Sequence, residues 1–248
     1  DQAAIDNIVY HAVCEKRASM EPGAKLYAVM GDEHTNPVHH MTQAGLLENI
    51  ALSQNNKDGS DHGKLLCAME LPYNYLAKYM HYAYALSAEP MKNVLQDYDM
   101  EGVRFVRAVL GDNVFHYAPQ SEGRIYQTCL NHHITSVNID ADYHFITEER
   151  EEIVRDDPVV RMIYGDTDTV PEMPSPRSAE GMMLRNATMA MRAWQAATQS
   201  HKADTIVIST GLGHVAGLEN YGYRYGSSLC KFLDVKIDGK GQILPIIF

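Results

Sequence analysis

The sequence predicts an α/β fold in which a mostly parallel central sheet is flanked by helices on both faces. Short apolar runs alternate with segments of helical periodicity, which is typical of a parallel sheet covered on both sides. Two of the runs, at 25–30 and 205–209, are each followed by a glycine and then by a histidine. No obvious linker divides the 248 residues, so we expect a single domain, 1–248.

The N-terminal part of the chain is predicted to supply two strands and the helix between them. Residues 3–17 carry apolar side chains at helical spacing, and the run at 25–30 follows them as the first strand. Asn36 and Pro37 are typical of the N-cap and first position of a helix, so a second helix is expected to begin there. The run at 65–69 is the second strand and ends in Glu70. Helices are also predicted after Pro72, in a tyrosine-rich segment, and over about 91–110.

The remainder is predicted to add a third strand and a terminal hairpin. Residues 111–150 are ambiguous between short strands and loops, 147–157 favours a solvated helix, and 165–177 favours a long loop. Ser178 is placed to cap a helix that runs to about 201, and 205–209 is the third strand. The alternating tail, 227–248, predicts a β-hairpin that turns at Asp238-Gly239.

Composition and charge narrow the class of protein. The net charge of −11 argues against a nucleic-acid-binding protein, which needs a basic face. No apolar stretch approaches the roughly 20 residues of a membrane span, and the first residues do not resemble a signal peptide. The sequence does not identify the cellular compartment. If a signal peptide has been removed, a bacterial periplasm or cell envelope is one of the alternatives. The 4 cysteines form no CxxC, which favours buried free thiols over a disulfide framework or a zinc knuckle.

Chemistry-bearing side chains gather where the predicted strands end. His34, His39 and His40 follow the first strand, and Glu70 follows the second. Because ligands bind at the carboxyl edge of such sheets, we expect these side chains in one site. A histidine at a helix N-terminus stays neutral and can bind a metal or accept a proton, while a carboxylate can ligate a metal, act as general base or orient a histidine. The structural alternatives are a core histidine and a glutamate that caps a helix or pairs with an arginine.

Two further elements complete the predicted site. Arg185 lies among methionines on one face of its helix, where burial is costly unless a carboxylate or an anionic ligand meets the guanidinium. It would hold Glu70 or Glu33, or stabilise a developing oxyanion; the alternative is an exposed arginine on an amphipathic helix. The segment 211–214, Gly-Leu-Gly-His, delivers a further histidine and offers backbone N–H groups to an anion.

Other patterns are interpreted structurally. Asn186-Ala-Thr188 matches a glycosylation sequon, but its helical setting indicates a coincidence. The segments 131–133 and 140–144 contain metal-ligand residue types without a recognised spacing, and the polarity of exposed loops explains them. The sequence has neither a GxSxG nucleophile elbow nor a Walker-type phosphate loop.

These elements, in this order, resemble the superfamily that contains erythromycin esterases, ChaN-like haem-uptake proteins and Tiki/TraB-type proteases. The segment from Gly31 to Gln43 is similar to the GE-x-H-x-NP-x-HH-x-x-Q signature of the ChaN-like branch, with Asp32 in place of the usual glutamate. The later motifs of the superfamily resemble Glu70 after the second strand, Arg185-Asn186 with Met189-Ala190, and Gly213-His214. The resemblance implies a sheet flanked by helices and a site formed by His34, Glu70, Arg185 and His214. It also implies either hydrolysis, through a histidine-activated water or a divalent metal, or haem binding.

Three functions are therefore expected, in this order. The first is hydrolysis of an ester or amide bond in a small-molecule or peptide substrate, and the second is haem binding by a dimer, with a tyrosine or histidine as axial ligand. The third is a non-catalytic interaction or effector protein on the same scaffold. The catalytic candidates are His34, Glu70, Arg185 and His214; the metal candidates are His34, Glu70 and His214; the cofactor-binding candidates are Glu33, His39, His40, Gly211 and Gly213.

Overall fold

The computed structural model describes eight stretches of the chain, which share one central sheet. They are residues 2–33, 36–56, 63–72, 122–141, 155–169, 172–175, 178–216 and 228–248. His34, the tyrosine-rich segment after Pro72, the helix expected at 91–110 and residues 142–154 lie outside them. None of the described helices is long and apolar enough to cross a membrane.

The sheet in the described residues has 5 strands, all parallel, in the order β3-β2-β4-β1-β5. This arrangement confirms the α/β class and the parallel sheet that the sequence predicts. The three predicted strands are present, and β3 arises from the region that the sequence leaves ambiguous. The strands are β1 (Lys25–Asp32), β2 (Leu65–Pro72), β3 (Thr135–Asp140), β4 (Thr205–Gly211) and β5 (Gly241–Ile247).

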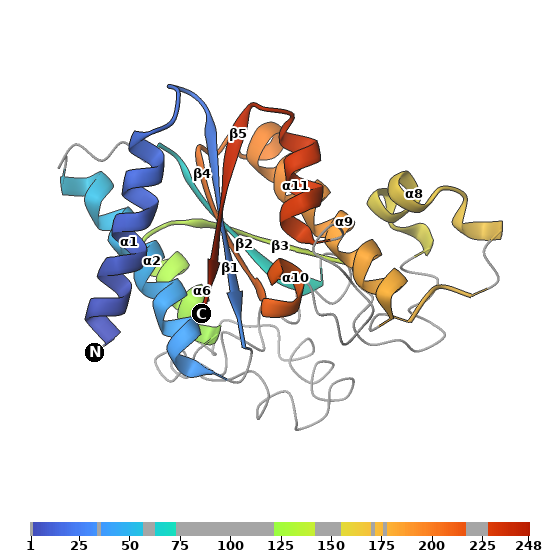
Figure 1. Cartoon of the computed structure of the whole chain (residues 1–248), viewed down its shortest axis with the longest axis horizontal. Helices are drawn as coiled ribbons and strands as arrows, with labels where there is room; N and C mark the ends of the chain where they lie inside the picture. The colour runs from blue at the N-terminus through green and yellow to red at the C-terminus, as the bar shows by residue number, and fades with distance from the viewer. Residues whose placement is uncertain are drawn as a thin grey trace, which may run out of the picture.

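Helices cover both faces of this sheet, as Figure 1 shows. On one face lie α1 (Gln2–Ala18), α2 (Pro37–Asn56) and α6 (Glu122–Asn131). On the other lie α9 (Ala179–Gln195), which a π-helical turn at Ala196–Ser200 continues, α10 (Leu212–Ala216) and α11 (Leu229–Ile237). A further helix, α8 (Pro158–Tyr164), packs on α9 away from the sheet, and a 3-10 turn at Thr167–Thr169 follows it.

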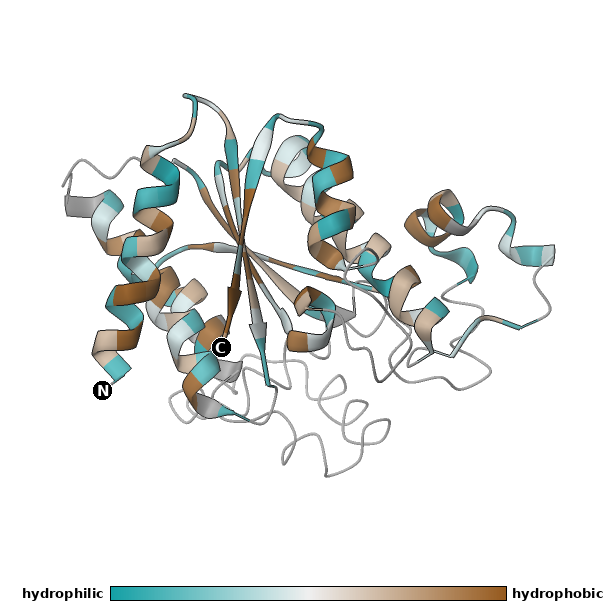
Figure 2. Cartoon of the chain, viewed as in Figure 1, coloured by the Kyte–Doolittle hydropathy of each residue, from teal (hydrophilic) through white to brown (hydrophobic). Residues whose placement is uncertain are grey.

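Two apolar cores lie on the two faces because successive strand residues point to opposite sides. In β1, Ala28 and Met30 pack towards α2, whereas Tyr27 and Val29 pack towards α9 and α11. Figure 2 shows both hydrophobic and hydrophilic segments around the helices, as expected when one side of each helix packs on a sheet. Full burial of a large apolar side chain contributes about 1.5–3 kcal/mol. Cysteines take part in both cores as free thiols: Cys67, Cys129 and Cys230 are buried, and Cys14 is half-buried.

The structure confirms the two helix N-termini that the sequence predicts, at Asn36 and at Ser178. The Asn36 side-chain oxygen accepts a hydrogen bond from the Val38 N–H at 3.1 Å, and the Ser178 hydroxyl accepts one from Gly181 at 3.1 Å. Each side chain thereby satisfies an N–H group that has no partner within the first helical turn. The two caps fix where α2 and α9 begin, and α9 carries Arg185.

The C-terminal strand is present, but the predicted hairpin is wrong. Residues 229–237 form α11, capped by Ser228, and β5 pairs with β1 in parallel. The buried side chains Leu229, Leu233 and Ile237 recur every four residues, which is helical spacing. A parallel neighbour requires a crossover connection, and α11 provides it. The dipeptide at 238–239 therefore ends a helix instead of turning a hairpin, with Asp238 in the left-handed region (φ 47°).

The glycine after the first apolar run has a different role from the sharp turn that the sequence suggests. Gly31 lies within β1, which continues to Asp32. A Cβ atom at Gly31 would lie 3.0 Å from the Val215 side chain and 3.2 Å from the Leu212 backbone. The glycine thus allows α10 to pack closely against β1. Since α10 carries His214, this contact contributes to the placement of a candidate site residue.

Candidate functional site

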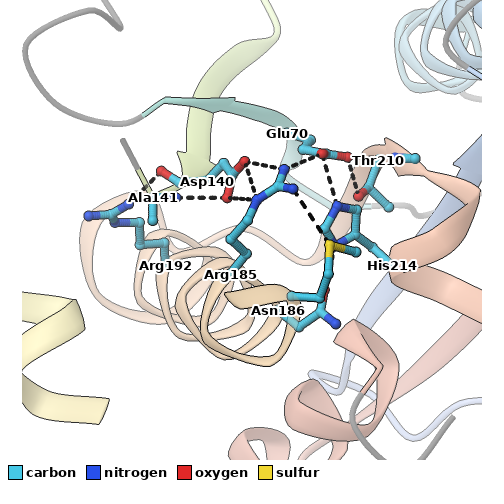
Figure 3. Close-up of polar contacts among 10 residues, drawn as sticks. Glu70, Asp140, Ala141, Arg185, Asn186, Arg192, Thr210 and His214 are labelled. Atoms are coloured by element: carbon cyan, nitrogen blue, oxygen red, sulfur yellow. Dashed lines mark hydrogen bonds and ion pairs between the residues drawn. The ribbon is translucent and has the colours of Figure 1, made fainter. Parts of the chain in front are cut away.

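Glu70 lies at the carboxyl end of β2 and is the centre of a buried polar cluster (Figure 3). One carboxylate oxygen, Oε2, accepts hydrogen bonds from the Thr210 hydroxyl at 2.8 Å and the Gly211 N–H at 2.6 Å. The other, Oε1, accepts from Arg185 Nη2 at 2.6 Å and lies 3.0 Å from His214 Nε2. A carboxylate has about four acceptor positions, so these four contacts occupy its hydrogen-bonding capacity.

Arg185 joins Glu70 to a second carboxylate, that of Asp140 at the end of β3. Its Nε and Nη2 atoms approach Asp140 Oδ2 at 3.1 and 2.6 Å, a forked arrangement that only a guanidinium can make. The arginine is 3% exposed and Asp140 is 1% exposed. Burial by itself lowers the pKa of Arg185, but the charges and hydrogen bonds of Asp140 and Glu70 outweigh it and raise that pKa above its ordinary value. Arg185 is therefore held as a cation between two carboxylates.

His214 faces the cluster from α10 and is 4% exposed. Its Nε2 atom faces Glu70, and its Nδ1 atom lies 2.5 Å from the Asn186 side-chain oxygen. Asn186 follows Arg185 on α9, so adjacent residues of one helix hold Glu70 and orient the histidine. Because Asn186 is fully buried, the sequon at this position is not accessible to glycosylation in the folded protein, which agrees with the interpretation as a coincidence.

A second polar cluster lies at the same edge of the sheet but on the opposite face. Asp32 Oδ2 accepts a hydrogen bond from Gln43 Nε2 at 2.8 Å, and Gln43 Oε1 accepts one from the Ser209 hydroxyl at 2.8 Å. His40 Nε2 lies 3.7 Å from Asp32 Oδ1. Asp32 and Ser209 share strand faces with Met30 and Val207, which pack towards α2. His40 is thus separated by the sheet from the cluster around Glu70.

The other residues after β1 have local partners. His39 Nδ1 accepts a hydrogen bond from the Glu33 N–H at 3.0 Å, and its ring stacks on Phe248 with centroids 4.9 Å apart. The side chain of Glu33 is exposed. Of the predicted candidates, the structure brings together Glu70, Arg185, His214 and Gly211, while Gly213 lies in α10 beside His214. His34 lies outside the described residues.

Sequence reasoning missed three members of the cluster: Asp140, Asn186 and Thr210. The interpretation of Asp140 as part of an exposed polar loop is wrong, since this residue is buried and holds Arg185. A signal for it was present in the sequence, because Asp140 follows the apolar Ile139 at the end of a short β-prone run, as Glu70 follows Met69. Asn186 belongs to the Arg185-Asn186 pair of the family resemblance, but that pair indicates no contact with His214, and nothing in the residue pattern marks Thr210. Both roles depend on how α9 and β4 pack.

The described residues do not fit a metal ion. They contain no group of three or more His, Cys, Asp or Glu side chains arranged to hold one. Both Glu70 oxygens accept hydrogen bonds from N–H or O–H donors, and both ring nitrogens of His214 face protein oxygens. A metal ligand needs a free lone pair. The Glu70 oxygens use theirs to accept these hydrogen bonds, and a ring nitrogen that donates to an oxygen carries a proton in place of a lone pair. We therefore derive no reaction step through a metal.

Comparisons of the chain with protein-family models, with curated proteins and with solved structures give no match.

Proposed function

We propose that the protein is a hydrolase of an ester or amide bond, with its reaction centre at the cluster around Glu70. The observation that carries this proposal is a buried carboxylate held between an arginine and a histidine, at the edge of a parallel sheet where ligands bind. Its three members come from β2, α9 and α10, as Figure 3 shows. The resemblance to esterases and proteases of the Tiki/TraB and erythromycin esterase superfamily supports the same class of reaction.

The energetic cost of the cluster supports a functional role. Burying an ion pair is often no more favourable than burying apolar side chains of similar volume, so a fold has little reason to place several charges there for stability alone. Here Glu70, Asp140 and Arg185 are all shielded from solvent, with side-chain exposures of 6, 2 and 4%. Buried charges and oriented histidines of this kind concentrate at catalytic sites.

The contacts suggest how the residues divide the work. Glu70, with four donors around it, orients His214 and Arg185 and is not the group that takes a proton from water. The proton that the leaving group receives is the one on His214 Nε2, which breaks its contact with Glu70 Oε1 as it is transferred, while Asn186 holds the ring at Nδ1. The family resemblance implies a role for His34 as well, and we assign it the activation of the attacking water.

Arg185 mainly fixes the two carboxylates. Its Nη1 atom, 3.7 Å from the weak acceptor sulfur of Met182, keeps donor capacity for the oxyanion that forms when water adds to the carbonyl. The Gly211 N–H donates to Glu70, so this group of the glycine-rich segment is not free to bind an oxyanion as expected from the sequence.

The proposal is tested by turnover of p-nitrophenyl esters from acetate to octanoate and of a quenched fluorescent peptide library. We expect at least one substrate to be hydrolysed, and we expect Glu70→Gln and His214→Ala each to lower kcat/KM by 100-fold or more. Arg161→Met is the matched control, because Arg161 lies in α8 and its exposed ion pairs join Asp156, just before that helix, and Asp168, in the turn after it. Cooperative urea unfolding of each variant shows that it is folded. Wild-type turnover in both site variants would remove the proposal.

Metal content and absorbance of the same purified protein decide between this proposal and its alternatives. A stoichiometric divalent metal whose removal abolishes turnover would replace the metal-free reaction with a metal-dependent one. A saturable Soret shift on titration with haemin, together with no hydrolysis, would replace the hydrolase by a haem-binding protein.

A further inference from the structure

Arg192, a second buried arginine of α9, continues the charge cluster away from Glu70. It follows Arg185 by seven residues, or about two helical turns, so both side chains lie on one face of the helix. Arg192 Nη1 donates a hydrogen bond to the Asp140 carbonyl oxygen at 2.6 Å, while Arg185 binds the carboxylate of the same residue. Asp140 is therefore held at its backbone and at its side chain by two arginines of one helix.

Asp157 connects this arrangement to α8. One of its carboxylate oxygens, Oδ2, pairs with Arg192 Nη2, and both side chains are buried. The other oxygen, Oδ1, accepts hydrogen bonds from the backbone N–H groups of Val159 and Val160 and so caps α8. A single carboxylate thus joins the start of α8 to α9.

A small apolar cluster packs the same elements together. Val160 of α8 contacts a buried group made of Ala141, Met173 and Leu184, of which Ala141 directly follows Asp140 and Leu184 directly precedes Arg185. The Ala141 N–H also donates to Asp140 Oδ1 at 2.8 Å. Apolar packing and the ion pair therefore both link α8 to the two residues that position Glu70.

We propose that docking of α8 on α9 sets the geometry of the reaction centre, with Arg192 and Asp157 as positioning residues. The connection runs from Asp157 through Arg192 to Asp140, and from Asp140 through Arg185 to Glu70. This inference rests on the proposed function for its effect on turnover, but its structural part is measurable without any substrate. It predicts that loss of one charge at the start of α8 loosens Arg185.

The experiment uses Asp157→Asn, which keeps a side-chain oxygen to cap α8 but removes the charge that faces Arg192. The readout is hydrogen exchange of the Arg185 Nε–H, followed by ¹⁵N NMR and assigned with Arg185→Lys. We expect this exchange to be at least 10-fold faster in Asp157→Asn than in the wild type. We also expect kcat to fall at least 10-fold with KM within twofold, because substrate contacts are kept while the charged groups shift.

Two further variants make the result decisive. Arg192→Lys keeps the charge but lacks the planar fork that reaches both Asp140 and Asp157, so it is expected to reproduce both effects even if Asp157→Asn fails to fold. Arg161→Met, in the same segment, is expected to leave the Arg185 exchange rate within twofold of the wild type. Unchanged Arg185 exchange in the folded Asp157→Asn and Arg192→Lys proteins overturns the inference, whatever the activity.

The two proposals fail in distinguishable ways. Faster Arg185 exchange in a protein that hydrolyses nothing supports the coupling and contradicts the hydrolase. Wild-type exchange and turnover in both variants of an active hydrolase contradict the coupling alone.

Discussion

At the scale of single residues, each charge in the cluster is held by side chains that are far apart in the sequence. Arg185 and His214 contact Glu70 although they lie more than 100 residues further along the chain. Asp140 lies between Glu70 and Arg185 in the sequence. The guanidinium of Arg185 is the shared element, because it contacts both carboxylates. Its removal leaves two buried negative charges next to each other.

The replacement Arg185→Met tests how much this guanidinium contributes. We expect a loss of about 3–5 kcal/mol in the free energy of unfolding, because one partner of a buried ion pair is removed and the carboxylates stay buried. Arg161→Met, which breaks the exposed ion pairs with Asp156 and Asp168, is expected to cost at most about 1 kcal/mol. Urea unfolding of both variants measures the difference. Equal losses would mean that the buried network contributes no more than an exposed one.

Cys230 provides a prediction on pH dependence. Burial raises the pKa of its thiol from 9.0 to about 11, and a backbone hydrogen bond offsets part of this effect. The unfolded thiol ionises near pH 9 while the folded one stays protonated, so the folded state binds more protons between these values and stability falls as the pH rises. A shift of this size corresponds to about 2–3 kcal/mol.

Urea unfolding at pH 8 and pH 11 measures this loss in the wild type and in Cys230→Ala. The variant lacks the thiol and is expected to lose about 2–3 kcal/mol less between the two pH values. An identical loss in both proteins would show that the thiol does not titrate differently on unfolding.

The sequence allowed part of the cluster to be predicted, for a physical reason. Glu70 and His214 each follow a recognisable apolar run, and the carboxyl ends of such strands converge. Arg185 is a candidate because a charge buried among methionines needs a partner of opposite charge. By contrast, the sequence predicts His40 in the same site as Glu70, whereas the sheet separates them. The face on which a residue lies depends on the register within the strand and on the angle of the following helix, and neither can be read from the residue pattern. The pattern around Asn186 describes a helix but not its rotation towards α10.

At the scale of elements, α11 shows how a residue pattern can favour the wrong structure. The tail alternates over short stretches, and Asp238-Gly239 is a common hairpin turn. Helical packing on the sheet decides the outcome, since Leu229, Leu233 and Ile237 are buried together on one side of α11. Asp238 then has to adopt the left-handed conformation that ends the helix, which is unfavourable for a residue with a Cβ atom.

Asp238→Gly is therefore expected to stabilise the protein. Relief of the left-handed conformation contributes about 1 kcal/mol, and the greater freedom of glycine in the unfolded chain offsets part of it, so the expected net gain is about 0.5 kcal/mol. Asp234→Gly, in the interior of α11, is the matched control and is expected to cost about 0.5 kcal/mol, from the lower helix propensity of glycine and the loss of the exposed pair with Lys231. Thermal unfolding distinguishes the two signs. A loss of stability in Asp238→Gly would show that the aspartate side chain contributes more than the strain removes.

At the scale of the whole molecule, the carboxyl edge of the sheet carries a polar cluster on each face. Ser209 and Thr210 are consecutive in β4, yet the first donates to Gln43 beneath α2 and the second donates to Glu70 beneath α9. This separation follows from the alternation of side chains along a strand. One cluster fastens α2 to β1 and β4, and the other fastens α9 and α10 to β2, β3 and β4, so the helical layers on the two faces are attached independently.

This independence predicts additivity between the two faces. Gln43→Leu removes the link between Asp32 and Ser209 and is expected to cost about 1–3 kcal/mol, because buried polar partners lose a hydrogen bond. Asp140→Asn weakens the hold on Arg185 on the other face. In urea unfolding, the double variant is expected to lose the sum of the two single losses within about 0.5 kcal/mol, since the residues are separated by the sheet and act on different partners. A coupling energy above about 1 kcal/mol would instead mean that the end of β4 transmits strain from one face to the other, and the two clusters would then have to be treated as one site.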